Sequence, residues 1–163
     1  MADYCLDSNV FIVAKNGPYG MDFAPGFWEW LDVEYEAGNI ISSIMVYNEL
    51  SDGDDELSDW VHARRETGFF VQPDEEVQAL FTQIADYVNA TYLPEEAEKF
   101  LDGADPWIIA QAIASGTKVV THESRVGANS TKVKIPNVAD HFGVECIGPY
   151  QLLRELNARF GLH

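Results

Sequence analysis

The chain has 163 residues, of which 47% are hydrophobic and 23% charged, and its 27 acids and 10 bases give a formal net charge of −17. These values are typical of one folded domain spanning residues 1–163, and no apolar run approaches the roughly 20 residues that cross a bilayer, so we expect no membrane partner. The excess of acids argues against broad, nonspecific binding to nucleic acid, because phosphate contacts need Lys and Arg.

Short apolar strands alternate with helices along the whole chain. The sequence predicts strands over residues 3–6, 39–43, 118–121, 132–136 and 144–148, and a short strand or an extended connector over 69–73. Helical spacing of apolar residues and Gly or Pro boundaries predict helices over 8–17, 26–38, 44–53, 56–68, 74–91, 93–103, 104–116, 137–143 and 149–161. This alternation is typical of an α/β fold, with a central parallel sheet flanked by helices.

Both cysteines, Cys5 and Cys146, lie far apart within apolar stretches, and no CxxC motif is present. The N-terminus lacks the basic and apolar regions of a signal peptide. We therefore expect two buried thiols in a reducing compartment, and a cytoplasmic protein.

Acidic side chains stand where the predicted strands end or where helices begin. Asp7 follows the first strand, Glu49 lies on the helix after the second, and Glu123 comes shortly after the strand 118–121. Asp105 opens the helix 104–116. Because functional residues of parallel sheets gather outside the carboxyl ends of strands, these acids are candidates for one shared site.

Each acid also has a purely structural interpretation. Asp105 before Pro106 has the pattern of a helix N-cap, and Asp7 has that of an N-cap or an Asx turn. Glu49 is equally consistent with a solvated helix residue and Glu123 with a surface loop. The joint placement, rather than any single residue, favours a common site.

Several carboxylates held within a few ångströms raise one another's pKa unless a cation accompanies them. The oxygen ligands favour Mg²⁺ or Mn²⁺, and such a site is suited to phosphodiester hydrolysis. Asn9, Asp102 and Thr121 are candidates for an outer shell that orients the ligands. The histidines show no HExxH or HxH spacing, which argues against zinc.

The combination of LDSNVFI, Glu49, ADPWIIAQA and VVTHE resembles the PIN domain, a family of small metal-dependent ribonucleases that includes VapC-type toxins. The resemblance runs from about Tyr4 to Ile147 in the expected order. It implies a three-layer sandwich with Asp7, Glu49, Asp105 and Glu123 as the family acids, where Glu123 replaces the usual Asp or Asn. The tail KIPNVADHFGVECIGPYQLL resembles a PIN-like branch known only as a domain of unknown function.

The resemblance implies a Mg²⁺- or Mn²⁺-dependent endoribonuclease whose RNA products carry a 5′-phosphate and a 3′-hydroxyl. It also implies an antitoxin protein and a homodimer as partners. The bases that we expect to contact RNA are Lys15, Arg125, Lys132 and Lys134.

Two other functions remain open at this stage. The net charge of −17 also suits a catalytically weak PIN-like module that acts through a protein partner. A haloacid-dehalogenase-like phosphatase also begins from an Asp at a strand end, but that chemistry needs an acid two residues later, where this chain has Asn9.

Overall fold

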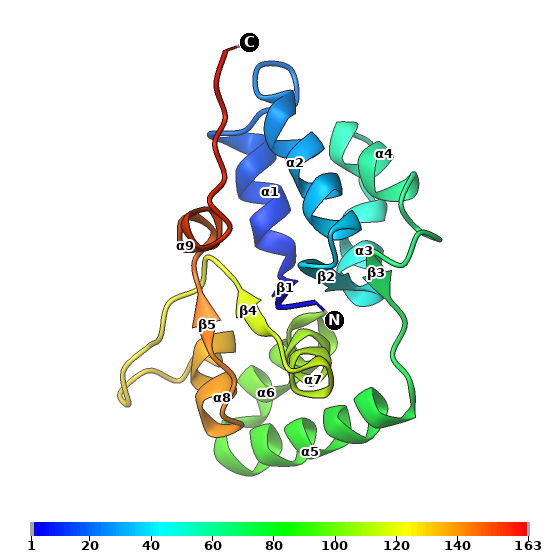
Figure 1. The fold of residues 1–163 in the computed structure, drawn as a ribbon. Helices are drawn as coiled ribbons and strands as arrows, with labels where there is room; N and C mark the ends of the chain where they lie inside the picture. The colour runs from blue at the N-terminus through cyan, green and yellow to red at the C-terminus, as the bar shows by residue number, and fades with distance from the viewer. Residues whose placement is uncertain (1, 163) are drawn as a thin grey trace.

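A computed structural model describes residues 2–162 and contains a five-stranded parallel sheet (Figure 1). The strands lie side by side in the order β3-β2-β1-β4-β5, and every neighbouring pair is parallel. Their bounds are Tyr4–Leu6 (β1), Ile40–Ser43 (β2), Phe70–Val71 (β3), Lys118–Val120 (β4) and Cys146–Ile147 (β5). The predicted α/β architecture, a parallel sheet flanked by helices, is confirmed.

Helices occupy most of the remaining chain. Their bounds are Ser8–Asn16 (α1), Pro25–Glu36 (α2), Ile44–Ser51 (α3), Glu56–His62 (α4), Glu75–Thr91 (α5), Pro94–Asp102 (α6), Asp105–Ser115 (α7), Ile135–His141 (α8) and Pro149–Glu155 (α9). The predicted α7 boundary at Gly116 is confirmed, since this residue ends the helix with a φ of 68°, a left-handed conformation that glycine adopts readily. None of the helices in the described part of the chain is both long and apolar enough to cross a membrane.

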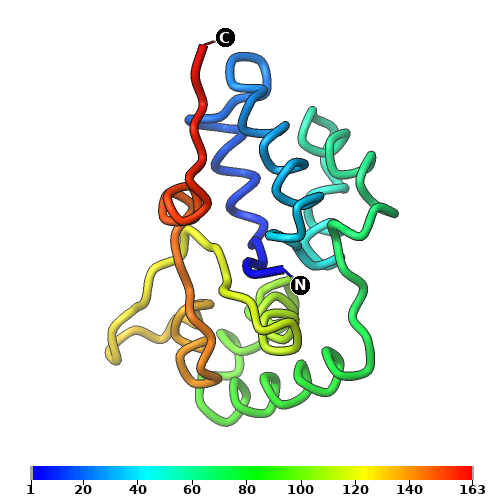
Figure 2. The backbone as a smooth tube through the Cα atoms, viewed as in Figure 1, coloured from blue at the N-terminus to red at the C-terminus, as the bar shows by residue number. Residues whose placement is uncertain are grey.

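The helices form layers on both sides of the sheet. Figures 1 and 2 show α1 and α2 on one side and α7 on the other, with α5 beyond α7. α7 packs against β1, β2 and β4, and most of its side chains are buried, as its continuous apolar sequence predicts. This buried helix carries its first residue, Asp105, toward the sheet edge where the strands end.

The central strand β1 is buried along its length. Cys5 and Leu6 have no exposed surface, as expected for a strand with neighbours on both sides and helices on both faces. Cys146 in β5 is only partly buried, which corrects the expectation of two buried thiols, and both thiols are free. β5 lies at the edge of the sheet, and this position explains the greater exposure of Cys146.

The strand predicted over residues 132–136 is wrong. Residues 132–134 are irregular, and Ile135 begins α8 with Pro136 in its first turn. A proline lacks the N–H that a strand ladder needs but is tolerated in the first turn of a helix. The place beside β4 is taken by β5 instead, and α8 lies between these two strands in the chain.

Two predicted helices end earlier than expected. α4 stops at His62, and the Arg64 guanidinium beyond it donates to the carboxylate of Asp32 on α2 and to the carbonyl of Trp60. α9 stops at Glu155, and Asn157 adopts a positive φ of 54°. The spacing of apolar residues does not reveal the contact between Arg64 and Asp32 or the positive φ of Asn157, so it does not predict where α4 and α9 end.

Candidate metal centre

Asp7 stands directly after β1 and is only 2% exposed. It is the N-cap of α1, because its Oδ1 accepts a hydrogen bond of 2.7 Å from the backbone N–H of Ser8. Its other oxygen, Oδ2, accepts a hydrogen bond of 2.8 Å from the Thr121 hydroxyl. Asp7 can therefore cap α1 and also take part in a polar site. Each of its carboxylate oxygens accepts one of these two hydrogen bonds and keeps a lone pair for a further partner.

Asp105 is the first residue of α7, and the N-cap is its neighbour Ala104. The interpretation of Asp105 as the N-cap of α7 is therefore wrong. Asp105 is partly buried, and none of the described residues donates a hydrogen bond to its carboxylate. A partly buried acid that faces two other carboxylates is costly to ionise unless a cation accompanies it.

Glu123 comes from the loop that follows β4. Its backbone N–H donates to the hydroxyl of Thr121 over 3.1 Å, which turns the chain back toward Asp7. The Glu123 side chain is 18% exposed, and its carboxylate lies 3.8 Å from the ammonium of Lys134. This acid is therefore partly covered rather than a solvated loop residue.

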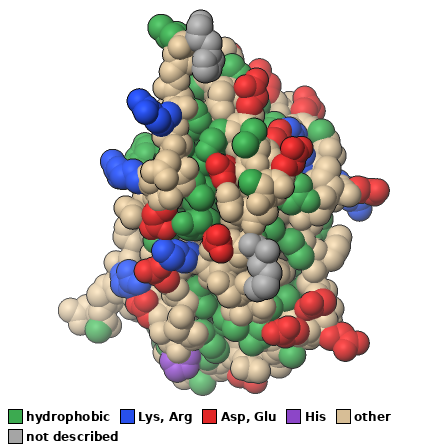
Figure 3. Space-filling model, viewed as in Figure 1, with side chains coloured by type: hydrophobic (Ala, Val, Ile, Leu, Met, Phe, Trp, Pro, Cys, Tyr) green, Lys and Arg blue, Asp and Glu red, His purple; other side chains and the backbone are tan. Residues whose placement is uncertain are grey.

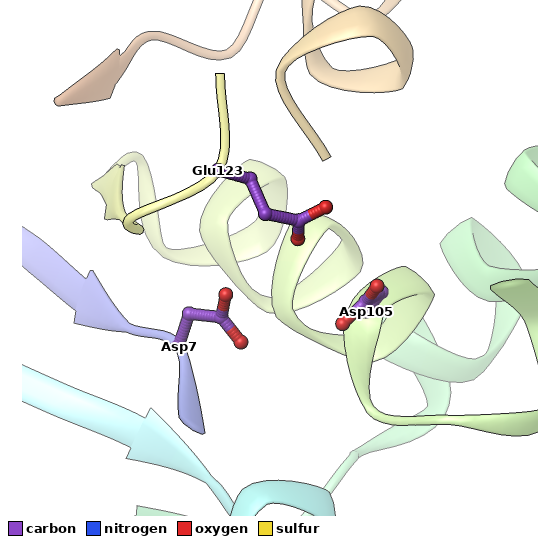
Figure 4. A group of neighbouring side chains, drawn as sticks. All are labelled: Asp7, Asp105 and Glu123. Atoms are coloured by element: carbon purple, nitrogen blue, oxygen red, sulfur yellow. The ribbon is translucent and has the colours of Figure 1, made fainter. Parts of the chain in front are cut away.

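The three side chains converge from separate elements (Figure 4). Asp7, Asp105 and Glu123 each place a carboxylate oxygen within 4.8 Å of the others. Three carboxylates at this spacing form a hard oxygen donor set, which is the type of ligand set that Mg²⁺ and Mn²⁺ prefer. The residues that are present thus match a divalent cation in chemistry and spacing.

The electrostatics of the cluster favour a cation as well. Burial raises the pKa of Asp105 to about 8, and the charges of Asp7 and Glu123 add to this effect. Burial also raises the pKa of Asp7 to about 6, although the hydrogen bond from Thr121 opposes the shift. The pKa of Glu123 is raised by burial too, while Lys134 lowers it. Protons and a divalent cation therefore compete for the same oxygens.

Glu49 lies beside the cluster but is held by other partners. Its Oε1 accepts from the backbone N–H of Ala104 over 2.8 Å, and its Oε2 accepts from the Ser8 hydroxyl over 3.0 Å. Three of the four predicted ligands therefore lie together in the structure. The fourth, Glu49, instead forms hydrogen bonds with Ser8 and Ala104, the neighbours of Asp7 and Asp105 in the chain. In this position the Glu49 side chain links the starts of α1 and α7.

The three predicted outer-shell residues have different environments. Thr121 is buried and donates to Asp7, while Asn9 donates to Thr121 over 3.1 Å and accepts from the backbone N–H of His122. Asp102 is an exposed residue at the end of α6, and no hydrogen bond joins it to the cluster within residues 2–162. The contact that sequence analysis missed is Ser8, whose hydroxyl bridges Asp7 and Glu49. The only indication of this role in the sequence is that Ser8 stands directly after Asp7 in the LDSN pattern.

The four bases that were expected to contact RNA are mostly paired with acids. Lys15 lies 2.6 Å from Asp55, Lys134 faces Glu123, and both guanidinium bonds of Arg125 to Asp140 measure 2.6 Å. Lys132 is exposed and forms no ion pair within the described chain. Figure 3 shows Asp and Glu side chains spread over much of one face, with few basic side chains among them.

Thr121→Val tests the hydrogen bond to Asp7. We expect this substitution to raise the pKa of Asp7 above its present value of about 6, because the donor that favours the charged carboxylate is lost. Titration of carboxyl carbons by NMR measures the shift. Thr121→Ser, which keeps the hydroxyl, is the matched control and should retain the lower pKa; equal pKa values in both variants would contradict the assignment.

Comparisons with known proteins agree with this architecture. The fold resembles one chain of VapBC2 from Rickettsia felis, whose crystal structure contains a DNA fragment from the VapBC2 promoter. The TM-score is 0.55 and the sequence identity is 13%, and the match covers 91% of this chain and 98% of that chain. It also resembles one chain of FitAcB from Neisseria gonorrhoeae, with a TM-score of 0.54, 21% identity and coverage of 90% and 98%. These likenesses establish the PIN-like α/β fold.

No curated protein matches the sequence. The family model described as "Domain of unknown function (DUF4411)" matches residues 4–160, which include β1 to β5 and all three clustered carboxylates. The chain therefore belongs to the DUF4411 family of domains of unknown function.

Proposed function

We propose that this protein is a Mg²⁺- or Mn²⁺-dependent endoribonuclease. The observation that carries the proposal is the convergence of Asp7, Asp105 and Glu123 within 4.8 Å at the carboxyl edge of a parallel sheet. The PIN-like fold supports it, and so does the order of the acids along the chain, which resembles that of PIN-domain ribonucleases.

Asp7, Asp105 and Glu123 would hold the cation, and Glu49 contributes negative charge beside them. When bound, the cation supplies a Lewis acid for phosphoryl oxygens and lowers the pKa of a coordinated water. The protein's part is to fix the ligands: Thr121 and Ser8 orient the carboxylate of Asp7, and Asn9 holds Thr121 in turn. Glu49 fixes the start of α7, and with it the position of Asp105.

The biological setting in this proposal is that of a toxin with an antitoxin protein partner. The support is structural, since the similar VapBC2 and FitAcB chains belong to toxin–antitoxin complexes. A cytoplasmic location and a homodimer are part of the same proposal. The homodimer follows from the family resemblance, and the two free thiols support a reducing compartment.

One observation favours a second function, that of a binding module which acts through a protein partner. Lys15, Lys134 and Arg125 lie against acids, so few free cations remain near the cluster to attract RNA. In this alternative the acids serve structural roles. Such a module need not take up metal, whereas the nuclease must.

A cleavage assay with end-labelled single-stranded RNA tests the proposal. We expect cleavage in Mn²⁺ or Mg²⁺, none in EDTA, and products with a 5′-phosphate and a 3′-hydroxyl. Asp7→Asn should lose this activity, while Asp86→Asn, which neutralises an exposed acid on α5, should retain it. Undiminished cleavage by Asp7→Asn would contradict the assignment of Asp7 as a metal ligand. If calorimetry detects no binding of Mn²⁺ to the parent protein, the binding module is favoured.

A further inference from the structure

A pocket of about 360 Å³ opens beside the carboxylate cluster, at the carboxyl ends of β4 and β5. Glu123 belongs both to its wall and to the cluster, and Thr121, which donates to Asp7, also lines it, so the pocket adjoins the cluster. The opposite wall is formed by the start of α9, including Tyr150 and Gln151. A strand of RNA whose phosphate lies at the carboxylates would therefore have a neighbouring nucleotide beside this pocket.

The size and lining of the pocket set the class of ligand. Small-molecule sites span about 300–1,000 Å³, so 360 Å³ accommodates a unit of nucleotide size rather than a folded element. The lining combines apolar groups, such as Pro136 and Ile147, with polar side chains of Arg125 and Gln151. A flat, apolar base joined to a polar sugar phosphate has the same mixed character.

Tyr150 gives the pocket an accessible aromatic ring. The residue is 51% exposed although it lies in the first turn of α9, and none of the described residues forms a hydrogen bond with its hydroxyl. Exposed aromatic rings beside a nucleic-acid path stack on bases, and every base offers such a face.

Arg125 and Gln151 line the pocket, and each has a carboxylate partner. Asp140 accepts from Nε and Nη2 of Arg125, both over 2.6 Å, which leaves Nη1 free of any hydrogen bond within the described chain. Glu155 accepts from the amide nitrogen of Gln151 over 3.0 Å, so the amide oxygen remains as an acceptor. Asp140 offsets the net charge of the guanidinium, but the remaining nitrogen, Nη1, can still donate to a phosphate oxygen.

We infer that this pocket is a nucleotide subsite, in which Tyr150 stacks on the base next to the cleaved phosphodiester and Arg125 donates to a neighbouring phosphate. The inference rests on the proposed ribonuclease function and deepens it, since the subsite would set which nucleotide flanks the cut.

Cleavage kinetics test the role of Tyr150. We expect Tyr150→Ala to raise KM for single-stranded RNA on the order of tenfold, with kcat changed by less than about twofold, because a stacking contact is lost while the ligands stay in place. Tyr150→Phe keeps the ring and should behave like the parent. Phe23→Ala removes a ring that is 67% exposed and lies outside the pocket, so it is the matched control.

A binding experiment separates failure of the subsite from failure of the nuclease proposal. AMP, GMP, CMP and UMP contain no internucleotide bond, so they can be titrated in Mg²⁺ while amide NMR shifts are recorded. Shifts centred on residues 146–151, absent with ribose 5-phosphate and lost in Tyr150→Ala, would support the subsite even if no RNA is cleaved. Amides that do not shift, together with an unchanged KM in Tyr150→Ala, would overturn the nucleotide subsite. That result is also the one expected if the pocket instead accepts a protein side chain.

Discussion

Asp105→Asn should abolish RNA cleavage and at the same time stabilise the metal-free protein. Loss of a direct ligand is expected to lower activity by at least about 100-fold, the upper end of what even an outer-shell substitution costs. The stabilisation arises because the carboxylate of Asp105 is partly buried, lacks a hydrogen-bond donor among the described residues and faces Asp7 and Glu123. A neutral amide of similar shape avoids both this repulsion, when Asp105 is ionised, and the proton uptake that keeps the carboxyl group neutral below about pH 8.

Thermal unfolding in EDTA measures the stability effect. A gain of about 1–2 kcal/mol corresponds to an increase in Tm of roughly 2–8 °C for a chain of this size. Asp86→Asn, at an exposed position on α5, should leave both Tm and activity unchanged. In Mn²⁺ the order should reverse, because only the parent protein gains stability from the ion. A less stable Asp105→Asn protein that still cleaves RNA would refute the assignment of Asp105.

The metal-free protein should lose stability as pH rises from about 5 to 8. Asp7 and Asp105 have pKa values of about 6 and 8 in the folded chain, whereas an unfolded Asp titrates near 3.9. Between those values the folded state binds more protons than the unfolded state, so the free energy of unfolding falls with increasing pH. Below the unfolded pKa the penalty is absent, and above about pH 8 it is complete.

The expected loss is on the order of 2 kcal/mol across this range, after a reduction for the partial exposure of Asp105. Urea unfolding in EDTA at pH 5.5, 6.5, 7.5 and 8.5 would measure it. In Asp105→Asn the part of the loss between pH 6 and 8 should disappear, which makes this variant the internal control. Stability that rises over this pH range would show that the cluster titrates normally.

Affinity for Mn²⁺ should change in the opposite direction. Because the ion binds the deprotonated carboxylates, the association constant should increase from pH 5.5 to pH 8, and binding should release protons. Calorimetry in buffers of different ionisation enthalpy reports that release. Proton release and apo-state destabilisation share one cause, the close approach of Asp7, Asp105 and Glu123.

Most of the fold was predictable from local patterns. The β1 strand followed by the helix Ser8–Asn16 shows why: an apolar run, a capping Asp7 and a Gly-Pro stop define these elements within a few residues. α7 was equally clear from its apolar sequence and its terminal Gly116. The strand predicted over residues 132–136 failed because an apolar run says nothing about whether a place in the sheet is free, and β5 occupies the place beside β4.

For the candidate site, the sequence by itself determined which acids follow strands and open helices, because these positions depend on neighbours along the chain. Only the tertiary structure decided how they meet. It grouped Asp7, Asp105 and Glu123, and it joined Glu49 to Ala104 and Ser8 instead. It also paired three of the four candidate RNA-contacting bases with acids that lie 11 to 40 residues away along the chain. The reason is physical: carboxylate spacing, burial and ion pairing arise between segments that only folding brings together.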